Sequence, residues 1–287
     1  MSGRLEESRP IAAVIPLRLL FWNMGSNATP ALVGTLAAEY KPDVIILAES
    51  AHGLATLVEE VNVRTGLLYG IPFHLTDRIQ FLVKMPSARI QPLYDDGAHM
   101  AIKHVQPVLG QNFILAAIHL PSKLFLNTEE QATLCCRWVS HICEAETKMG
   151  HQRTVVIGDL NMNPFEAGVV GAEGLHAVSS RAVAARKTRT VLNEERQLFY
   201  NPMWSMMGDA IDPPGTYYYA SSKPISYFWN TFDQILLRPE LARHFAPGDA
   251  IVVSSAGGES LLSPAGIPNN KISDHLPIMG TIRLEIQ

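Results

Sequence analysis

The sequence has few charged residues and no excess of positive charge. Charged residues make up 17% of the 287 residues, hydrophobic residues make up 47%, and the formal net charge is -4 at pH 7. This composition predicts a globular protein with a sizeable core and excludes a disordered chain. The acidic balance argues against a protein held on nucleic acid by overall basicity. It does not exclude a nuclease, because an active site built of carboxylates is itself acidic.

Cysteine is nearly absent from the sequence. Its three cysteines are Cys135, Cys136 and Cys143, which all fall in one predicted helix and form no CxxC pair. A structural zinc site and a disulfide framework are therefore not expected. A reducing compartment fits best, and we expect a cytoplasmic protein.

Long apolar runs, repeats and linkers are also missing. The apolar run after the polar N-terminus is interrupted by Pro16 and Arg18, so it is too short to span a bilayer, and no cleavage site follows it. No segment is rich enough in Pro, Gly or Ser to mark a domain boundary. We expect a flexible leader over residues 1–14 and a single domain over residues 15–287, with no membrane contact and no obligate protein partner.

Strand-like and helix-like segments alternate along the chain. Helices are predicted over residues 28–40, 51–64 and 127–149; Asn127 or Thr128 caps the last of these, and Gly150 ends it. Strands are predicted over residues 17–23, 43–49, 80–84, 89–94, 100–106, 113–119, 154–158, 217–220, 232–237, 251–254 and 278–285. Residues 168–209 are predicted to be helical and irregular. The pattern indicates an α/β fold with more than one sheet and with helices on the outer faces.

Several of these apolar strands stop at an acid, an amide or a histidine. The residues at these stops are Asn23, Glu49, His119, Asp159 with Asn161, Asp233, and Asp274 with His275. Each one alone is more often a turn residue or a structural histidine. Together they are residue types that bind hard cations or relay protons, and strand ends gather at one rim of a sheet. We therefore favour a functional site over a set of unrelated turns.

The segments around these stops resemble a known family. The segments are Phe21–Asn23, Pro42–Glu49, Ile118–Ser122, Gly158–Asn161, Phe232–Ile235 and Ser273–Pro277, in that order. They are similar to the ordered motifs of the endonuclease/exonuclease/phosphatase superfamily, which includes DNase I, AP endonucleases, deadenylases, sphingomyelinases and inositol polyphosphate 5-phosphatases. The resemblance covers about residues 17–285. It implies a DNase I-like four-layer α/β sandwich, with two central mixed β-sheets flanked by helices.

The resemblance also implies a role for each residue at the stops. Hydrolysis of an anionic phosphodiester needs charge neutralisation and an oriented water, and Mg²⁺ or Mn²⁺ accepts carboxylate and amide oxygens. Glu49 is the expected principal metal ligand, with Asn23 and Asp274 beside it. Asp159 would orient or deprotonate the water, and Asn161 would support Asp159 or hold a phosphate oxygen.

The histidines complete the predicted catalytic set. His275 would act as a base or stabilise charge, and His119 would protonate the leaving oxygen or bind the phosphate. Asp233 would fix the tautomer of a catalytic histidine. We expect its partner to be His119, with His275 as the alternative. Ser122 and Lys123 could bind the phosphate, although Lys123 could equally be an exposed loop lysine.

Three functions remain open: a nuclease acting on DNA or RNA, a phosphodiesterase or phosphatase for a small phosphorylated molecule, and an inactive binding module. The signatures of 5-phosphatases and AP endonucleases are absent, and no membrane-inserting hairpin is evident, which weakens a lipid substrate. The basic run of Arg181, Arg186, Lys187 and Arg189 is either a solvated face or a nucleic-acid contact. The aromatic residues around Trp204 and over 217–219 either stack on bases or pack in the core. We interpret Asp96 and Gly97 as a hairpin turn, not as a metal site with His99.

Overall fold

Two β-sheets stacked face to face form the centre of the molecule in the computed structural model, which describes residues 13–75, 78–209 and 211–286. One is a five-stranded sheet with the order β15 (Ala250–Val252), β18 (Ile278–Glu285), β1 (Val14–Asn23), β2 (Val44–Ala48) and β3 (Ile79–Val83). The other is a seven-stranded sheet with the order β4 (Ile90–Asp95), β5 (Met100–Val105), β6 (Phe113–His119), β7 (Thr154–Asp159), β14 (Asp233–Leu237), β11 (Phe199–Tyr200) and β8 (Ala177–Val178).

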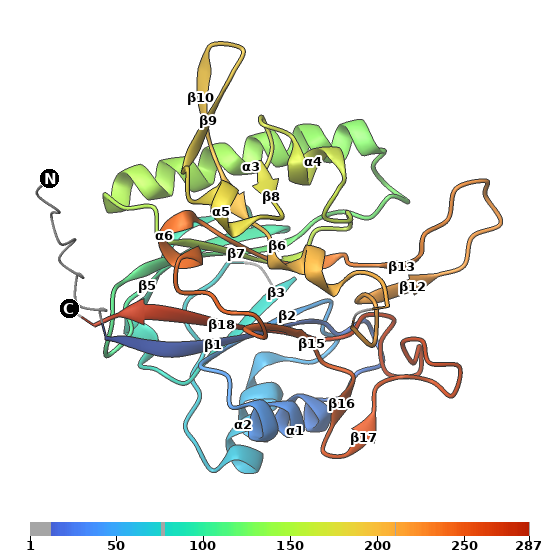
Figure 1. Ribbon diagram of the computed structural model, residues 1–287. Helices are drawn as coiled ribbons and strands as arrows, with labels where there is room; N and C mark the ends of the chain where they lie inside the picture. Colours follow the sequence, from blue (N-terminus) through green and yellow to red (C-terminus); the bar gives the residue numbers. More distant parts are fainter. Residues whose placement is uncertain (1–12, 76–77, 210, 287) are drawn as a thin grey trace, which may run out of the picture.

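Helices cover the outer faces of both sheets (Figure 1). The five-stranded sheet is covered by α1 (Pro30–Tyr40) and α2 (Leu54–Thr65), and the seven-stranded sheet by α3 (Thr128–Met149), α4 (Ala167–Val170) and α5 (Arg181–Ala184). The shorter elements are η1 (Ser87–Arg89), η2 (Pro202–Met206), α6 (Pro239–Ala242), and the pairs β9 (Thr188–Val191) with β10 (Glu194–Gln197), β12 (Tyr217–Tyr219) with β13 (Phe228–Asn230), and β16 (Ser255–Ala256) with β17 (Glu259–Ser260). The predicted four-layer α/β sandwich is confirmed.

The central strands are apolar on both faces because each face is covered. On β1, Leu19 and Phe21 point into the core between the sheets, whereas Leu20 and Trp22 point into the core beneath α1 and α2. This alternation follows from the two-residue period of a strand. Strands β1 and β2 are parallel, as are β6 and β7, while β1 and β18 are antiparallel. Both sheets are therefore mixed, as expected.

The helix ends confirm the predicted capping. Asn127 accepts hydrogen bonds from the backbone of α3, and Glu130 closes the capping box by accepting from the Asn127 N–H at 2.7 Å. Gly150 ends the helix in the left-handed conformation, with φ of 69°. Helix α1 begins two residues later than predicted, because Thr29 is its N-cap and Pro30 its first residue.

Two sequence predictions need correction. Most of the predicted leader, residues 1–14, lies outside the described residues, but β1 already begins at Val14. The stretch 168–209 is not mainly helical, because it contains β8, the β9–β10 hairpin and β11 as well as the short helices α5 and η2 and most of α4. The hairpin turn uses Leu192 and Asn193, both with positive φ, and so it lacks the glycine that usually marks such a turn. The Asp96–Gly97 turn, in contrast, connects β4 to β5 as predicted.

Within the described residues, none of the helices combines the length and the apolar character that crossing a bilayer would require.

A buried ion pair joins α3 to the seven-stranded sheet. Arg238 Nε donates to Glu146 Oε1 at 2.8 Å, and the two side chains are 1% and 3% exposed. Thr154 Oγ1 donates to the same carboxylate oxygen at 2.7 Å. The guanidinium lies 3.9 Å from the centre of the Phe199 ring. All the charged groups of this pair are therefore satisfied without water.

We expect Glu146→Ala to lower the free energy of unfolding by about 3–5 kcal/mol, because it leaves Arg238 buried and unpaired. Urea unfolding followed by circular dichroism measures this loss. The matched control is Glu60→Ala, which breaks the exposed pair of Glu60 with Arg64 one turn further along α2 and should cost under about 0.5 kcal/mol. Equal losses of unfolding free energy in the two variants would contradict the burial and pairing of Glu146 with Arg238.

Candidate active site

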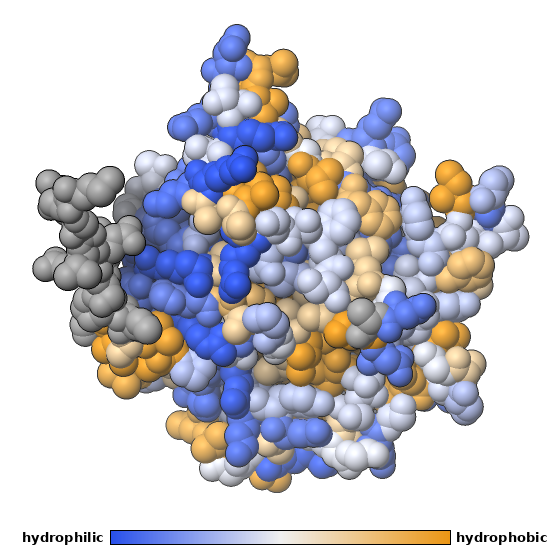
Figure 2. All heavy atoms as spheres, viewed as in Figure 1, coloured by the Kyte–Doolittle hydropathy of each residue, from blue (hydrophilic) through white to orange (hydrophobic). Residues whose placement is uncertain are grey.

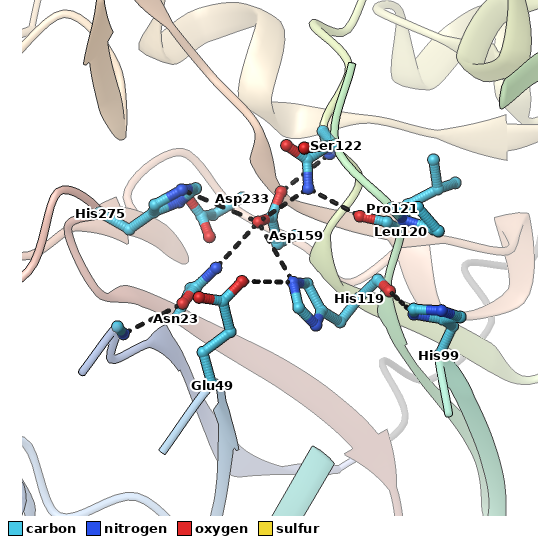
Figure 3. Close-up of polar contacts among 12 residues, drawn as sticks. Asn23, Glu49, His99, His119, Leu120, Pro121, Ser122, Asp159, Asp233 and His275 are labelled. Atoms are coloured by element: carbon cyan, nitrogen blue, oxygen red, sulfur yellow. Dashed lines mark hydrogen bonds and ion pairs between the residues drawn. The ribbon is translucent and has the colours of Figure 1, made fainter. Parts of the chain in front are cut away.

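Three neighbouring strands of the seven-stranded sheet place their chemical groups side by side. In the strand register, His119 on β6 lies beside Asp159 on β7, and Asp159 lies beside Asp233 on β14. Asn23 ends β1 in the other sheet, and Glu49 directly follows β2, whose last residue pairs with Asn23. The sheets therefore bring the predicted residues to one shared edge (Figure 3).

Gly158 makes the close approach of β7 to β6 possible. Its φ is 151°, and a Cβ at this position would lie 1.8 Å from the carbonyl oxygen of Ile118. No other residue fits there without moving the strand. Because Asp159 follows directly, this approach sets the position of the Asp159 carboxylate beside His119.

The loop after Asp159 turns back onto its own carboxylate. Asn161 has a positive φ of 47°, which asparagine tolerates. Its backbone N–H donates to Asp159 Oδ1 at 2.8 Å, and its side-chain amide donates to the carbonyl oxygen of Leu120 at 2.7 Å and to Asp159 Oδ2 at 3.2 Å. Asn161 therefore orients Asp159, which is one of the two roles predicted for it.

Asp159 is the central residue of the site. Its side chain is buried, and its Oδ2 accepts a hydrogen bond from Asn23 Nδ2 at 3.1 Å, across the boundary between the two sheets. The same oxygen lies 4.0 Å from His119 Nε2 and 3.8 Å from His275 Nε2. Together with the Asn161 amide, this one carboxylate oxygen therefore faces two amides and two imidazoles (Figure 3).

The partner of Asp233 is His275 and not His119, so the favoured sequence prediction was wrong. His275 Nδ1 donates to Asp233 Oδ2 at 2.9 Å. Asp233 is fully buried, and its backbone N–H donates to Thr216 Oγ1 at 3.1 Å. A carboxylate on Nδ1 fixes the imidazole so that Nε2 faces Asp159. The sequence places both histidines at strand ends, and only the packing of the loop before β18 selects between them.

His119 pairs instead with Glu49. His119 Nε2 lies 2.9 Å from Glu49 Oε1, and the Glu49 side chain is 51% exposed. His99 and His119 are joined by two contacts. The backbone N–H of His119 donates to the His99 carbonyl at 2.8 Å, and the side-chain Nδ1 of His99 lies 2.9 Å from the His119 carbonyl. His99 therefore holds β6 in place beside the site, a role for which its sequence position gave no signal.

Backbone contacts position His275 from the other side. Trp22 Nε1 donates to the carbonyl of His275 at 3.0 Å, and Ser273 Oγ donates to the carbonyl of Asn23 at 2.8 Å. Both residues belong to the segments quoted above, but the sequence assigned them no role. Thr216, which supports Asp233, lies in no recognisable motif, so the sequence could not have identified it.

The neighbouring carboxylates raise the pKa of both imidazoles. Burial disfavours charge on His275, but Asp233 and Asp159 outweigh it and raise the pKa of His275 to about 10. Burial likewise opposes charge on His119, yet the hydrogen bond to Glu49 and the charge of Asp159 raise the pKa of His119. The same hydrogen bond lowers the pKa of Glu49. Carboxylates and imidazoles therefore alternate through the site, and each carboxylate favours the charged form of its imidazole neighbour.

Two groups of side chains could hold a cation. The ligand atoms of Asp159, Asp233 and His275 lie within 4.8 Å of one another, but all three are buried and two of them already bond to each other. Glu49 and Asp274 offer carboxylates that are exposed. A hydrated Mg²⁺ needs oxygen donors and room for water, so the donor chemistry fits the exposed side of the site.

The other predicted ligands lie beside Glu49 or at the rim. Asn23 Oδ1 accepts from the backbone N–H of Gly25 at 3.2 Å. A Cβ on Gly25 would lie 3.8 Å from Asp274 Oδ1. Asp274 is thus near Asn23 and adds to the negative charge around His275.

The predicted phosphate ligands lie on the loop after His119. Lys123 is exposed, bonds to Glu166 Oε1 at 2.6 Å, and lies 5.7 Å from the centre of the Phe232 ring. Ser122 Oγ accepts from the backbone N–H of Leu124 at 3.4 Å. Lys123 is therefore already paired, and a phosphate would have to compete with Glu166 for it.

The basic run does not reach this edge of the sheet. Arg181 donates to the carbonyl of Phe245, which follows α6 at the end of β14 opposite to Asp233. An apolar cavity of about 450 Å³ lies there, lined by residues that include Arg181, Tyr200 and Phe245. Arg181 therefore lies away from the edge of the sheet that carries Asp159 and His119.

Comparison of the fold with solved structures places it among DNase I-like proteins. No protein-family model and no curated protein sequence matches the chain. The structure of D. rerio TDP2 complexed with a single-strand DNA product is similar, with 18% identity, 93% of this chain and 98% of that chain covered, and a TM-score of 0.53. ANGEL2, a 2′,3′-cyclic phosphatase in complex with adenosine-2′,3′-vanadate, has 12% identity, coverage of 95% and 97%, and a TM-score of 0.56.

An endonuclease/exonuclease/phosphatase family protein from Bacteroides thetaiotaomicron is also similar, with 10% identity, coverage of 96% and 100%, and a TM-score of 0.53. At these identities the comparisons show the fold and do not assign an activity. The fold is the one that the six sequence segments implied.

The pairing of His275 with Asp233 predicts an unusual titration. In the metal-free protein, NMR of the imidazole nitrogens should show His275 protonated up to about pH 10. Because this value lies above the unfolded value of about 6.5, the stability from the pair is complete below about pH 6.5 and is lost as the pH rises through about 10.

Asp233→Asn should lower the pKa of His275 by removing its buried counter-charge. His151 is the internal control, because burial lowers the pKa of His151 to about 4 and the substitution should leave its signals unchanged. An ordinary pKa for His275 in the unsubstituted protein would contradict the assigned pairing.

Proposed function

We propose that this chain, which has the DNase I-like fold, is a divalent-metal-dependent phosphodiesterase, and more specifically a nuclease acting on DNA or RNA. The observation that carries the proposal is the environment of Asp159. Its buried carboxylate lies within 4.0 Å of two imidazoles and beside the half-exposed carboxylate of Glu49. A purely structural cluster would not leave one carboxylate open to solvent at its centre.

The proposed metal is Mg²⁺ or Mn²⁺, which would neutralise charge on the phosphate when bound. Glu49 is its proposed principal ligand, with Asn23 and Asp274 completing the protein donors. The exposed carboxylates support this assignment, because a hydrated cation can reach them without entering the core. The hydrogen bond from His119 to Glu49 lowers the carboxylate pKa and keeps Glu49 ionised.

The remaining catalytic roles are assigned to side chains of the protein. Asp159, oriented by Asn161, would accept a proton from the attacking water. His275 is held charged by Asp233, and this favours transition-state charge stabilisation over the role of a base. His119, whose pKa is raised by Glu49 and Asp159, would donate a proton to the leaving oxygen. Ser122 and Lys123 are proposed to contact the phosphate, with Lys123 exchanging Glu166 for the substrate.

Two of the similar structures support a nucleic-acid substrate. That of D. rerio TDP2 holds a single-strand DNA product, and that of ANGEL2 holds adenosine-2′,3′-vanadate. A small phosphorylated molecule is therefore the alternative substrate. The intact set of Glu49, Asp159 and His275 argues against an inactive binding module. We place the activity in one domain over residues 15–287 and in the cytoplasm, since Cys135, Cys136 and Cys143 are free thiols.

Hydrolysis of bis-p-nitrophenyl phosphate with Mg²⁺ or Mn²⁺ tests the activity. We expect His275→Ala and Asp159→Asn to lower kcat by roughly 10²–10⁴-fold, the usual contribution of a positioned acid, base or charge. EDTA should abolish the reaction. Glu173→Ala is the control, because Glu173 pairs only with Arg196 at the surface among the contacts described. Full activity of His275→Ala would refute the mechanism.

Metal binding separates the role of Glu49 from that of Asp159. We expect Mn²⁺ to raise the melting temperature of the unsubstituted protein, since a ligand that binds the folded state stabilises it. Glu49→Ala should remove most of this increase, whereas Asp159→Asn should retain more of it. Thermal melting with and without Mn²⁺ makes the comparison. An increase that is equal in all three proteins would exclude Glu49 as the principal ligand.

A further inference from the structure

A hairpin rich in aromatic residues projects from the molecule next to the candidate site. It consists of β12, β13 and their connecting loop, residues 220–227 (Figure 1). Its base is joined to the site, because Tyr217 forms an isolated bridge with His275. The ring of Tyr217 lies 4.7 Å from the His275 ring and 5.2 Å from that of Phe232. The hairpin therefore starts at a catalytic side chain.

Two of the exposed rings further out on this hairpin form a cross-strand pair, and the ring centre of Phe228 lies 6.3 Å from that of Tyr218. Tyr219 is two residues beyond Tyr217, so the two side chains share a face, and Tyr219 pairs with Phe228 across the strands. Tyr219 is 57% exposed and Phe228 is 50% exposed. By strand geometry they lie about 7 Å beyond Tyr217. We call Tyr219 and Phe228 the stacking face.

The backbone at Phe228 is strained in a way that the core does not require. Phe228 has a φ of 60°, which is rare for a bulky residue. Such strained conformations cluster at active sites and ligand-binding segments. Here it accompanies a ring that is half exposed to solvent. Packing alone does not explain why this conformation is kept.

The charge of the surrounding segments suits an anionic ligand. Residues 216–232 contain no Asp or Glu and one Lys, Lys223. Residues 120–127, the loop after His119, also contain no acid and one Lys, Lys123. These two segments meet where Lys123 lies 5.7 Å from the Phe232 ring centre. The two segments carry no acid of their own, and the carboxylate of Glu166 that pairs with Lys123 comes from outside them, so an anionic ligand would replace Glu166 at Lys123.

We propose that the stacking face binds unpaired bases of a single-stranded nucleic acid whose phosphate lies at Asp159 and His275. The inference rests on the proposed phosphodiesterase function and specifies its substrate. Exposed rings beside a cationic groove are the common means of binding single strands, because every base has a face that can stack. A base-paired duplex keeps its bases stacked on each other and cannot use these rings.

A lipid surface fits the hairpin less well. An element that inserts into a membrane carries its apolar residues at the tip. The tip of this hairpin carries the polar residues Ser221, Ser222 and Lys223 beside a single exposed aliphatic residue, Ile225. In Figure 2 most of the projection is pale or blue, with an orange group near its outer end. Its exposed rings lie instead along the strands that lead back to His275.

The test compares an eight-nucleotide single strand, the matching duplex and bis-p-nitrophenyl phosphate as substrates. For Tyr219→Ala and Phe228→Ala, we expect the ratio of kcat/KM on the single strand to kcat/KM on bis-p-nitrophenyl phosphate to fall roughly 5- to 150-fold. The ratio should be kept by Tyr219→Phe and Phe228→Tyr, which retain a ring. Ile225→Ala is the matched control, because Ile225 is a 73% exposed aliphatic residue of the same hairpin.

The outcomes separate this inference from the proposed function. An unchanged ratio in both alanine variants would overturn the stacking face, even if the unsubstituted protein cleaves both substrates. If the alanine variants lose binding to vesicles of phosphatidylcholine and phosphatidylserine but keep the kcat/KM ratio, the stacking face is overturned in favour of a lipid-binding surface. If the unsubstituted protein cleaves nothing, the proposed function fails. In that case, fluorescence anisotropy with the single strand tests the stacking face by itself. Weaker binding by the two alanine variants than by the unsubstituted protein would support it, and equal binding would overturn it.

Discussion

The parallel pairing of β6 with β7 is the constraint on which the site depends. Register places His119 beside Asp159, and the missing side chain at Gly158 lets the strands come close enough for the two groups to share one space. Strand β14 then adds Asp233 on the other side of Asp159. Because these positions are fixed by backbone hydrogen bonds, the carboxylates cannot move apart to relieve their repulsion. They must be neutralised where they are.

Neutralisation comes from imidazoles and, in our proposal, from a cation. His275 compensates Asp233 and Asp159 in the interior, while His119 compensates Glu49 at the surface. The interior pair is buried and joined by a hydrogen bond of 2.9 Å, and this suits a group that must keep one orientation. The outer carboxylates remain open to solvent, where a metal ion and its waters can exchange. Burial thus separates the site into an interior pair of fixed orientation and outer carboxylates whose ligands can exchange with solvent.

The sequence predicted the fold and the membership of the site better than it predicted the contacts within the site. Apolar runs that end in Asn23, Glu49, His119 or Asp159 are local signals, and strand geometry converts them into a shared edge. The choice of His275 over His119 as the partner of Asp233 depends on how the loop before β18 packs on Trp22 and Ser273. No local pattern encodes that packing. The β9–β10 hairpin was missed because its turn contains no glycine.

The hydrogen bond from Asn23 to Asp159 joins a strand of one sheet to a strand of the other. Beneath this hydrogen bond, the two halves of the site are held in register by the core between the sheets, which includes Phe21 and Ile157. A protein interior is densely packed and transmits a change in volume to its neighbours. Substitutions deep in this interface, far from any charged group, would thus reach the chemistry by sliding one sheet against the other. Evolution could adjust the rate of such an enzyme without altering a residue that touches its substrate.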